Sequence, residues 1–600
     1  MISRTIKTDL LCGLSLLFFF TSLIYDPGFI DKYNPPKALY FISITFLALL
    51  FIGANTIIKR TSRKVELNLA DLIFIVFNLF YIIPFLFQGD FWGSFDRNFF
   101  LRLSLLGFYF IIKNLYNELP AEKRDKFILV FILGIIIIAF IQDLVAIKQI
   151  LSHDIPKGAF DNSGPYANFL AIIVILASGS LLSNVFTKKW IVRFILFFIF
   201  LSLFILIYAK ARTAWVALPV GVLLLLFQNY HSVIRKLYFR HKKNSIVVLA
   251  FLLAVVSITG WYMYQMKKDS ADGRILIWKT TFAAISEKPL FGHGPEGFQV
   301  ARGQAQVNYF VKHWDYEHEK ILADDLKFAF NDYLQITAET GIAGFLLFFL
   351  LLILAFNVPT KDKMIVLIKT GLAVLFITSL FSYSLQRIST MMLWIFFLAI
   401  LSANMPLKPV ISINLKPFTS ITAGILITAG AIAVLFFTIQ LFIANHRWKN
   451  TYQDFQSGES ETAVVFYNKL YPILKGDPYF LYNYGVVLSM SDQYNQSIAI
   501  FEKCKLKLYD NDLLTFLGNS YKQEGDYLAS EQAFLEAIYL VPHKFLSRYQ
   551  LAGLYIETGQ TEDALYWANE IIGEEPKVPS PLIEKMKNDM LKFVTSNSKK

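Results

Sequence analysis

The sequence predicts an all-α membrane protein with many spans, followed by a helical solenoid. Three observations support this prediction. Hydrophobic residues make up 55% of the 600 residues and charged residues only 17%, which excludes a single water-soluble globule. Apolar runs of about 20 residues, the length that crosses a bilayer, recur along residues 1–445. After residue 445 the hydrophobicity falls and a repeat of 33 to 34 residues begins, which is typical of stacked helix pairs.

The apolar runs and the basic residues between them predict the spans and their orientation. Lys and Arg gather in every second connection, for example at Lys59 and Arg60, and again from Arg235 to Lys243. Such connections lie in the cytoplasm. The N-terminus is then cytoplasmic, whereas the long loop 265–341 and the C-terminal tail lie outside. The thirteen predicted spans are Leu10–Tyr25, Ala38–Ile58, Leu69–Phe87, Phe99–Ile112, Phe127–Ile147, Tyr166–Phe186, Ile191–Ala209, Thr213–Tyr230, Ser245–Tyr264, Ile342–Phe356, Met364–Tyr383, Met391–Met405 and Ile421–Asn445.

The net charge of +12 does not indicate nucleic-acid binding, because the basic residues lie mostly in short clusters between apolar runs. The two cysteines, Cys12 and Cys504, are too few for a disulfide framework or a cysteine-based metal site. We therefore expect chemistry to come from other residues.

Polar and charged residues that suit a binding site gather in and near the long loop. The spans around Arg212 leave room for two crossings and no more, so Arg212 lies at the outer boundary, either as a functional residue or as an anchor to lipid phosphate. A helix is expected from Ser270 or Asp272 to about Glu287. Within it, Arg274 and Trp278 are four residues apart and project together, as a phosphate-binding guanidinium and an aromatic ring that stacks on a sugar.

The second half of the loop is rich in His and acidic residues without forming a metal motif. His313 and His318 are five residues apart, which is no standard zinc spacing, so we expect a solvated polar loop and no metal. A helix is predicted from Ala323 to Glu339, with Gly341 ending it.

The order of four motifs resembles the O-antigen ligase and polymerase superfamily, which includes bacterial O-oligosaccharyltransferases. The resemblance covers roughly residues 1–445, and the motifs together are more specific than each alone. They are Phe160-Asp-Asn-Ser-Gly-Pro-Tyr-Ala-Asn168, Ala211-Arg-Thr-Ala-Trp215, Gly273-Arg-Ile-Leu-Ile-Trp278 with Pro289-Leu-Phe-Gly-His-Gly294, and Asn331-Asp-Tyr-Leu-Gln335 with Glu339-Thr-Gly-Ile-Ala-Gly344.

The resemblance implies a metal-independent GT-C-like glycosyltransferase without a cofactor, in the bacterial inner membrane with its loop and tail in the periplasm. Such enzymes move a glycan from undecaprenyl pyrophosphate to an acceptor hydroxyl of lipid A core, a protein or a growing glycan. Arg212 and Arg274 match the family arginines that hold the pyrophosphate. Trp278 and Asn331 join them as expected substrate-binding residues.

One position departs from the family. A His that serves many members as the base directly precedes the Asn of the last motif, and here Phe330 stands there. Phenylalanine accepts no proton. Asp325 and Glu319 are the favoured replacements, ahead of His293, His313 and His318; alternatively, arginine-assisted departure of pyrophosphate suffices, or the chain is an inactive scaffold of glycan assembly. A transporter is disfavoured because the middles of the spans are almost uncharged.

The tail resembles tetratricopeptide repeats. Gly485, Gly518 and Ala552 are 33 and 34 residues apart, and Phe501 and Phe534 repeat with the same spacing. Small residues at such positions let paired helices pack closely. The expected domains are 1–445 and 446–600. We expect the repeats to bind a protein partner, which makes a protein acceptor more attractive, or else to cap the outer loop.

Overall fold

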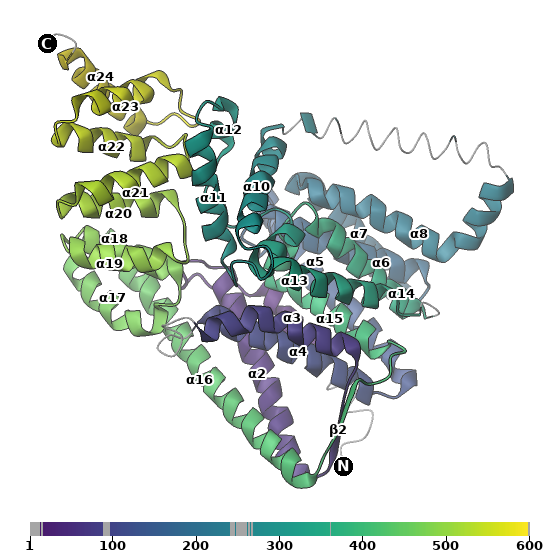
Figure 1. The fold of residues 1–600 in the computed structure, drawn as a ribbon. Coiled ribbons are helices and arrows are strands. Elements are labelled where there is room, and N and C mark those ends of the chain that lie inside the picture. Colours follow the sequence, from purple (N-terminus) through teal and green to yellow (C-terminus); the bar gives the residue numbers. More distant parts are fainter. Residues whose placement is uncertain are drawn as a thin grey trace.

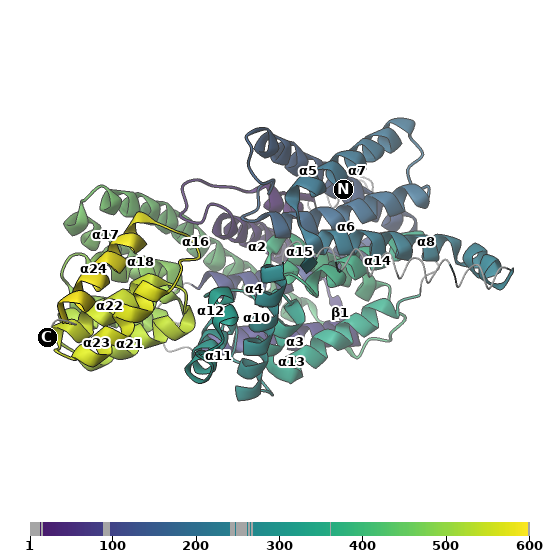
Figure 2. The same cartoon turned by 90° about the horizontal axis from the view of Figure 1, so that it is seen from above.

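The computed structural model describes residues 13, 16–87, 96–240, 247, 261, 264–265, 268–359 and 362–597. In these residues nearly all regular structure is helical, as the sequence predicts, and the one sheet has two strands. The helices form two groups, which Figures 1 and 2 show from two directions. Long apolar helices form one group, and α17 to α24 stack beside them in the other.

Eleven of the thirteen predicted spans correspond to helices in the described part of the chain. Nine are long and apolar enough to cross a membrane, and α14 (Lys363–Ser379) and α15 (Ile388–Ala403) are shorter. The predicted spans 10–25 and 245–264 lie partly or mostly outside the described residues, so the count of thirteen stays a prediction. The nine long helices are α2 (Asn34–Lys59), α3 (Leu69–Leu86), α4 (Arg97–Glu118), α5 (Ala121–Leu151), α6 (Ser163–Leu182), α7 (Lys189–Ala209), α8 (Arg212–Arg240), α13 (Asp332–Phe356) and α16 (Pro417–Gln456).

Helices α6 and α15 lie at the centre of the membrane group. The apolar part of α6 is 83% buried, and α15 is buried along nearly its whole length. The corresponding part of α16 is only 22% buried although it is just as apolar. Exposing so large an apolar surface to water is unfavourable, so the outer helices must be surrounded by lipid.

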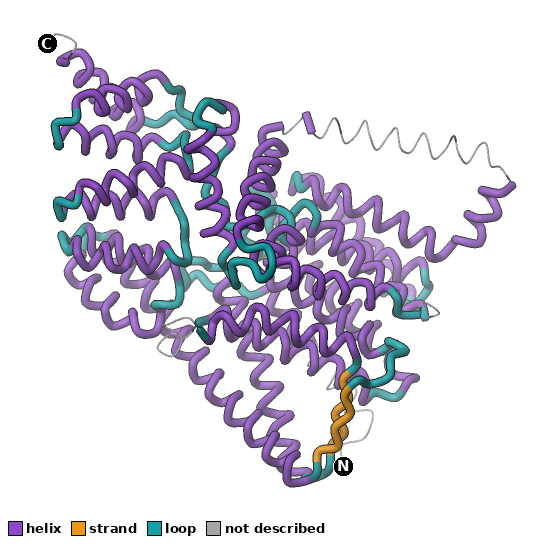
Figure 3. The backbone as a smooth tube through the Cα atoms, in the orientation of Figure 1, coloured by secondary structure: helices purple, strands orange, loops and turns teal. Residues whose placement is uncertain are grey.

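A small sheet joins the ends of α2 and α16 that lie farthest from the tail. Strand β1 (Arg63–Leu67) pairs antiparallel with β2 (Ile411–Leu415), with Val65 opposite Ile413, and Figure 3 shows both strands in orange. The sequence analysis predicted no strand here. The alternation of apolar and polar residues in β2 was a usable signal, which its short length concealed.

The long loop folds into three helices before the chain re-enters the membrane group. They are α10 (Lys268–Glu287), α11 (Phe298–Lys312) and α12 (Glu317–Leu322). The expected start of the first helix at Ser270 or Asp272 was wrong, because α10 already includes Lys268. The expected helix from Ala323 to Glu339 was also wrong in its first half: the chain is irregular up to Asn331, and α13 begins at Asp332.

A crossing of two backbones fixes this loop to α13. Helix α13 breaks at Gly341, whose φ of 67° and ψ of −176° are accessible to glycine alone. The segment from Pro289 to Gly294 fills the break: Pro289 O accepts from Ile342 N at 2.8 Å, and His293 N donates to Ala338 O at 2.9 Å. A Cβ at Gly341 would lie 2.2 Å from the carbonyl oxygen of Leu290. The helix that was predicted to stop at Gly341 therefore breaks there, and the segment from Pro289 to Gly294 packs into the break.

The C-terminal helices form the repeat that the sequence predicts. A Cβ on Gly485 would lie 2.4 Å from the ring of Phe501, and one on Gly518 would lie 2.6 Å from the ring of Phe534. The repeated Gly and Phe are thus one packing contact made twice. The helices are α17 (Ser460–Leu474), α18 (Pro478–Ser489), α19 (Tyr494–Lys505), α20 (Asn511–Gln523), α21 (Tyr527–Leu540), α22 (Phe545–Glu557), α23 (Thr561–Gly573) and α24 (Pro581–Asn597).

The predicted domain boundary at residues 445 and 446 falls inside α16. This helix runs without interruption from Pro417 to Gln456, so one continuous helix connects the membrane group with the repeats. The division into 1–445 and 446–600 stays a prediction.

We predict that Gly341→Ala destabilises the protein by about 1–3 kcal/mol, because a side chain neither fits the crossing nor adopts this backbone conformation. Thermal unfolding of the purified protein in detergent measures the effect as a lower Tm. Gly430→Ala in α16 is the control, because a Cβ there meets nothing within 4 Å. Equal Tm values for the two variants would contradict this account of the crossing.

Candidate functional site

Arg212 and Arg274 lie next to each other where the long loop meets the membrane helices. Arg212 is the first residue of α8, directly after the turn that ends α7. Its Nη2 donates to Ser270 Oγ at 2.8 Å, and Ser270 lies one turn before Arg274 on α10. Burial and the charge of Arg212 lower the pKa of Arg274 to about 10. Two guanidinium groups therefore share a half-buried position, an arrangement that a negatively charged ligand stabilises.

Three aromatic rings continue the site away from the two arginines. The Arg274 guanidinium lies 5.4 Å from the centre of the Phe330 ring, which meets the Tyr383 ring edge-on at 5.2 Å. Phe328 stacks on Tyr383 at 4.4 Å. Arg387 lies 4.8 Å from the centres of both Phe328 and Tyr383. A row of flat apolar faces thus connects one guanidinium group with the next.

Phe330 has a strained backbone. Its φ of 52° is in the left-handed region, which is uncommon for any residue other than glycine, and unusual for a bulky aromatic. Backbone strain of this kind persists only where the surroundings enforce it, and it is concentrated at functional sites. The position at which the family carries a His is therefore held in a special conformation although the side chain here is apolar.

Arg387 and Asp161 belong to this cluster and were missed by the sequence analysis as site residues. Arg387 pairs with Asp161 Oδ2, which also accepts from Asn34 Nδ2 at 3.5 Å. The other oxygen of Asp161 is buried without a hydrogen-bond partner among the described residues. Lys37 donates to the backbone of Ala159, two residues away. Asp161 was part of the quoted motif that begins at Phe160, so only its role was hidden; Arg387 lay in a short connection that the sequence did not single out.

The loop that carries Tyr383 and Arg387 is fixed by a buried carboxylate. Asp332, the first residue of α13, accepts from Leu385 N at 2.9 Å and is 1% exposed. Because Asp332 follows Phe330 by two residues, the same contact holds both sides of the aromatic row together.

Trp278 and Asn331 lie at this site with their polar groups engaged by the protein. Trp278 Nε1 donates to Ala329 O at 3.1 Å. The side-chain oxygen of Asn331 accepts from the backbone N–H groups of Tyr333 and Leu334 and so caps α13. Both residues hold the segment that presents Phe328 and Phe330. Their expected contacts with substrate stay predictions.

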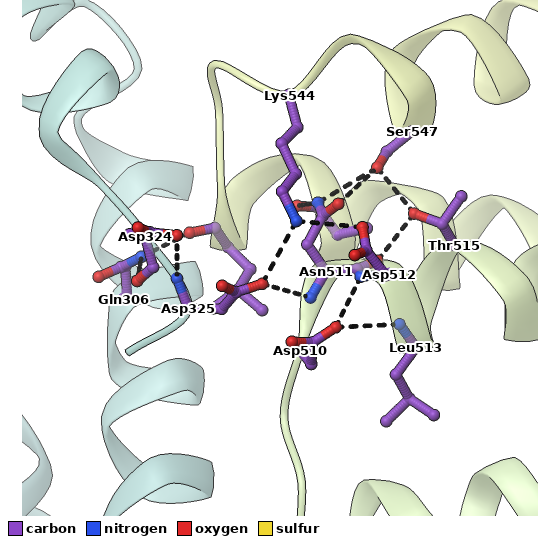
Figure 4. A network of polar contacts seen from close by, with 12 residues as sticks. Gln306, Asp324, Asp325, Asp510, Asn511, Asp512, Leu513, Thr515, Lys544 and Ser547 are labelled. Atoms are coloured by element: carbon purple, nitrogen blue, oxygen red, sulfur yellow. Dashed lines mark hydrogen bonds and ion pairs between the residues drawn. The ribbon is translucent and has the colours of Figure 1, made fainter. Parts of the chain in front are cut away.

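The two favoured bases each bind other residues of the protein. Glu319, on α12, accepts from the Tyr309 hydroxyl at 2.5 Å and pairs with Lys279 at 3.3 Å. Asp325 faces the repeats: Oδ2 accepts from Asn511 N at 2.9 Å and lies 3.6 Å from Lys544 Nζ, as Figure 4 shows. Glu319 and Asp325 are thus engaged by Tyr309 and Lys279 and by Asn511 and Lys544, respectively.

The electrostatic surroundings of Asp325 suit an interface. Burial alone would raise the pKa of Asp325, but Lys544 and the N–H of Asn511 outweigh it and hold this pKa below its usual range. The neighbouring Asp510 shows the opposite effect, because burial and the charge of Asp325 raise its pKa to about 6. Lys544 and Asn511, which stabilise Asp325 as an anion, both belong to the repeats.

The segment 323–331 therefore connects the repeats with the site. Its start is bound to the N-terminus of α20 through Asp325, and its end carries Phe328 and Phe330. Helix α11 strengthens the same interface, because Val300 and Val307 pack on a cluster of buried repeat residues around Leu540. Trp314 packs edge-on against Tyr539 at 5.4 Å.

The O-antigen ligase family model matches residues 196–349, and a tetratricopeptide repeat model matches residues 512–543. The first match contains α8, the long loop and the break at Gly341. No curated protein matches the chain.

The fold and the matches define a multi-pass membrane protein of the glycan ligase or polymerase kind. The chain contains an O-antigen ligase domain followed by tetratricopeptide repeats, which confirms the resemblance found in the motifs. A family of this kind uses a lipid-linked glycan and an acceptor, and the repeats are of a type that binds other proteins. Among the described residues, no three His, Cys, Asp or Glu side chains lie together as metal ligands.

We predict that Asp325→Asn loosens the attachment of segment 323–331 to the repeats. Loss of a buried charged hydrogen bond costs about 1–3 kcal/mol, so backbone amides at the N-terminus of α20 and in this segment exchange about 5- to 150-fold faster. Hydrogen exchange with mass spectrometry measures the change.

The control is Asp512→Asn, because Asp512 pairs with the same Lys544 at 3.0 Å but its side chain is 54% exposed. An exposed pair contributes about 0–1 kcal/mol. Similar exchange in both variants would show that Asp325 does not fasten the segment.

Proposed function

We propose that this enzyme transfers a glycan from undecaprenyl pyrophosphate to an acceptor hydroxyl at the outer, periplasmic face of the bacterial inner membrane. The adjacency of Arg212 and Arg274 is the observation that supports it most. Guanidinium groups bind phosphate oxygens in pairs of parallel hydrogen bonds, and two of them match the two phosphates of a diphosphate. Their position next to apolar helices suits a donor whose tail stays in lipid.

In the proposed reaction the acceptor oxygen attacks the anomeric carbon of the first sugar. The bond from that carbon to the pyrophosphate oxygen breaks, and the pyrophosphate leaves with the electron pair. Arg212 and Arg274 stabilise the negative charge that develops on the leaving oxygen. Donors fixed in place before the reaction lower the barrier most, because no reorganisation is required.

The aromatic row provides a surface for sugar rings. Phe328 and Phe330 are half-buried, and Tyr383 is buried behind them. Sugar C–H groups pack against the accessible ring surface with little loss of side-chain freedom. Trp278 widens this surface on the side of α10. We propose that the glycan extends along the row from Arg274 towards Arg387.

Asp161 is our proposal for the proton acceptor in place of the family His. Two carboxylates belong to the cluster. Asp332 is 1% exposed, whereas the side chain of Asp161, which pairs with Arg387, is 26% exposed and its Oδ1 has no hydrogen-bond donor among the described residues. The acceptor hydroxyl would donate to the Asp161 carboxylate and lose its proton there as the new bond forms. Glu319 and Asp325 are the candidates for the base that the sequence suggested.

A protein acceptor is the second possibility, and growth of a glycan chain the third. The repeats favour a protein acceptor, because they form a second binding surface that contacts the segment 323–331. An inactive scaffold remains the alternative without chemistry. A purified assay that offers lipid and protein acceptors side by side distinguishes these possibilities.

We predict that Arg212→Ala and Arg274→Ala each lower transfer by about 100-fold or more, the usual effect of removing one charge-stabilising donor. Surface glycan in cells that make the lipid-linked oligosaccharide, followed by purified transfer rates, measures this. Arg274→Lys also loses activity, because an ammonium group cannot form the paired contacts of a guanidinium.

Lys268→Ala is the matched control, since it removes one positive charge from the same helix α10. Transfer that survives both arginine substitutions at normal protein levels would overturn the pyrophosphate assignment.

We predict that Asp161→Asn lowers the rate constant of transfer by about 10²- to 10⁴-fold, the range of general base catalysis. Glu319→Gln and Asp325→Asn, measured in the same assay, test the earlier candidates. Activity lost in Glu319→Gln but kept in Asp161→Asn would assign the base to α12 instead.

A further inference from the structure

A cavity of about 440 Å³ lies between α16 and α17, where α16 extends beyond the membrane group and the repeats begin. Its size is within the range of small-molecule sites. The site described above does not include it. Its lining contains the apolar residues Ile443, Phe466 and Ile473 and the polar residues Arg447, Lys469 and Asn450, and each helix contributes both kinds.

The two cations of this cavity are exposed and take part in no ion pair among the described residues. Lys469 Nζ lies 5.3 Å from the ring of Phe466. Asp454 also lines the cavity, but it follows Arg447 by seven residues, about 10 Å farther along α16 from the membrane. The end of the cavity nearer the membrane is therefore positively charged.

The apolar residues of the cavity lining continue into the part of α16 that faces lipid. The side chains of Phe436, Ile439 and Ile443 are 56%, 58% and 40% exposed, and Ile443 belongs both to this stripe and to the cavity lining. The apolar run of α16 ends at Asn445, two residues before Arg447. The exposed apolar stripe of α16 thus borders the positively charged end of the cavity. These two surfaces complement the acyl chains and the phosphate of a phospholipid.

We propose that this cavity binds the headgroup of an anionic phospholipid of the surrounding leaflet. Arg447 and Lys469 contact the headgroup phosphate, and an acyl chain follows the exposed stripe of α16. Basic side chains at a membrane surface attract anionic headgroups, and Arg adds paired hydrogen bonds to phosphate. The lipid would hold the base of the repeats against the membrane.

The test uses the full-length protein in detergent and native mass spectrometry with added phosphatidylglycerol. The variant is Arg447→Gln combined with Lys469→Gln. The control is Lys449→Gln combined with Lys475→Gln, which makes the same change of charge at residues that do not line the cavity. We expect phosphatidylglycerol to bind the first variant at least about 10-fold more weakly than the wild type and the control.

Two further ligands identify what is bound. Diacylglycerol, which lacks the phosphate, is expected to bind all three proteins equally weakly, and glycerol phosphate, which lacks the chains, is expected not to displace the lipid. Equal affinity of phosphatidylglycerol for the variant and the wild type would overturn the site. Displacement by glycerol phosphate would overturn the lipid and leave a site for free phosphate.

Discussion

The proximity of two like charges, Arg212 and Arg274, is the constraint on which the rest of the structure depends. They come from different helices, α8 and α10, and Arg212 reaches the second helix through Ser270. Two guanidinium groups repel each other, and partial burial of Arg274 makes the repulsion stronger. A negatively charged ligand between them would relieve this repulsion.

Much of the surrounding architecture fixes the elements that hold this pair. The crossing at Gly341 fastens α10 and its following turn to α13, and Asp332 fastens the loop of Arg387 to the same helix. The segment 323–331 connects the site with the repeats through Asp325. The repeats therefore contact, through Asp325, the same segment that presents Phe328 and Phe330.

The sequence revealed the parts of this arrangement that depend on composition and spacing. Apolar runs determine membrane helices because the bilayer leaves the backbone no other partner, and the 33-residue repeat reflects one Gly–Phe contact made twice. Arg212 was visible because charge at a membrane boundary is rare, and Arg274 because it lies four residues before Trp278 in the predicted helix of the loop. Their adjacency was not, since it depends on how α10 packs after a long loop.

The carboxylates show where sequence reasoning is weakest. Asp325 and Glu319 are both carboxylates of the long loop. Asp325 contacts Asn511 and Lys544 of the repeats, and Glu319 contacts Tyr309 and Lys279. The sequence indicates neither set of contacts. Asp161 is about fifty residues before Arg212 and meets Arg387 only through tertiary packing. Which acid lies beside which base is a property of the fold rather than of local sequence.

The most direct test of the arginine pair compares two lipids that differ by one phosphate. Equilibrium binding of undecaprenyl pyrophosphate and undecaprenyl phosphate to the purified protein in nanodiscs should show tighter binding of the diphosphate, and replacing either Arg212 or Arg274 by Ala should remove that preference. Equal affinities for the two lipids, or a preference that survives both substitutions, would contradict the account.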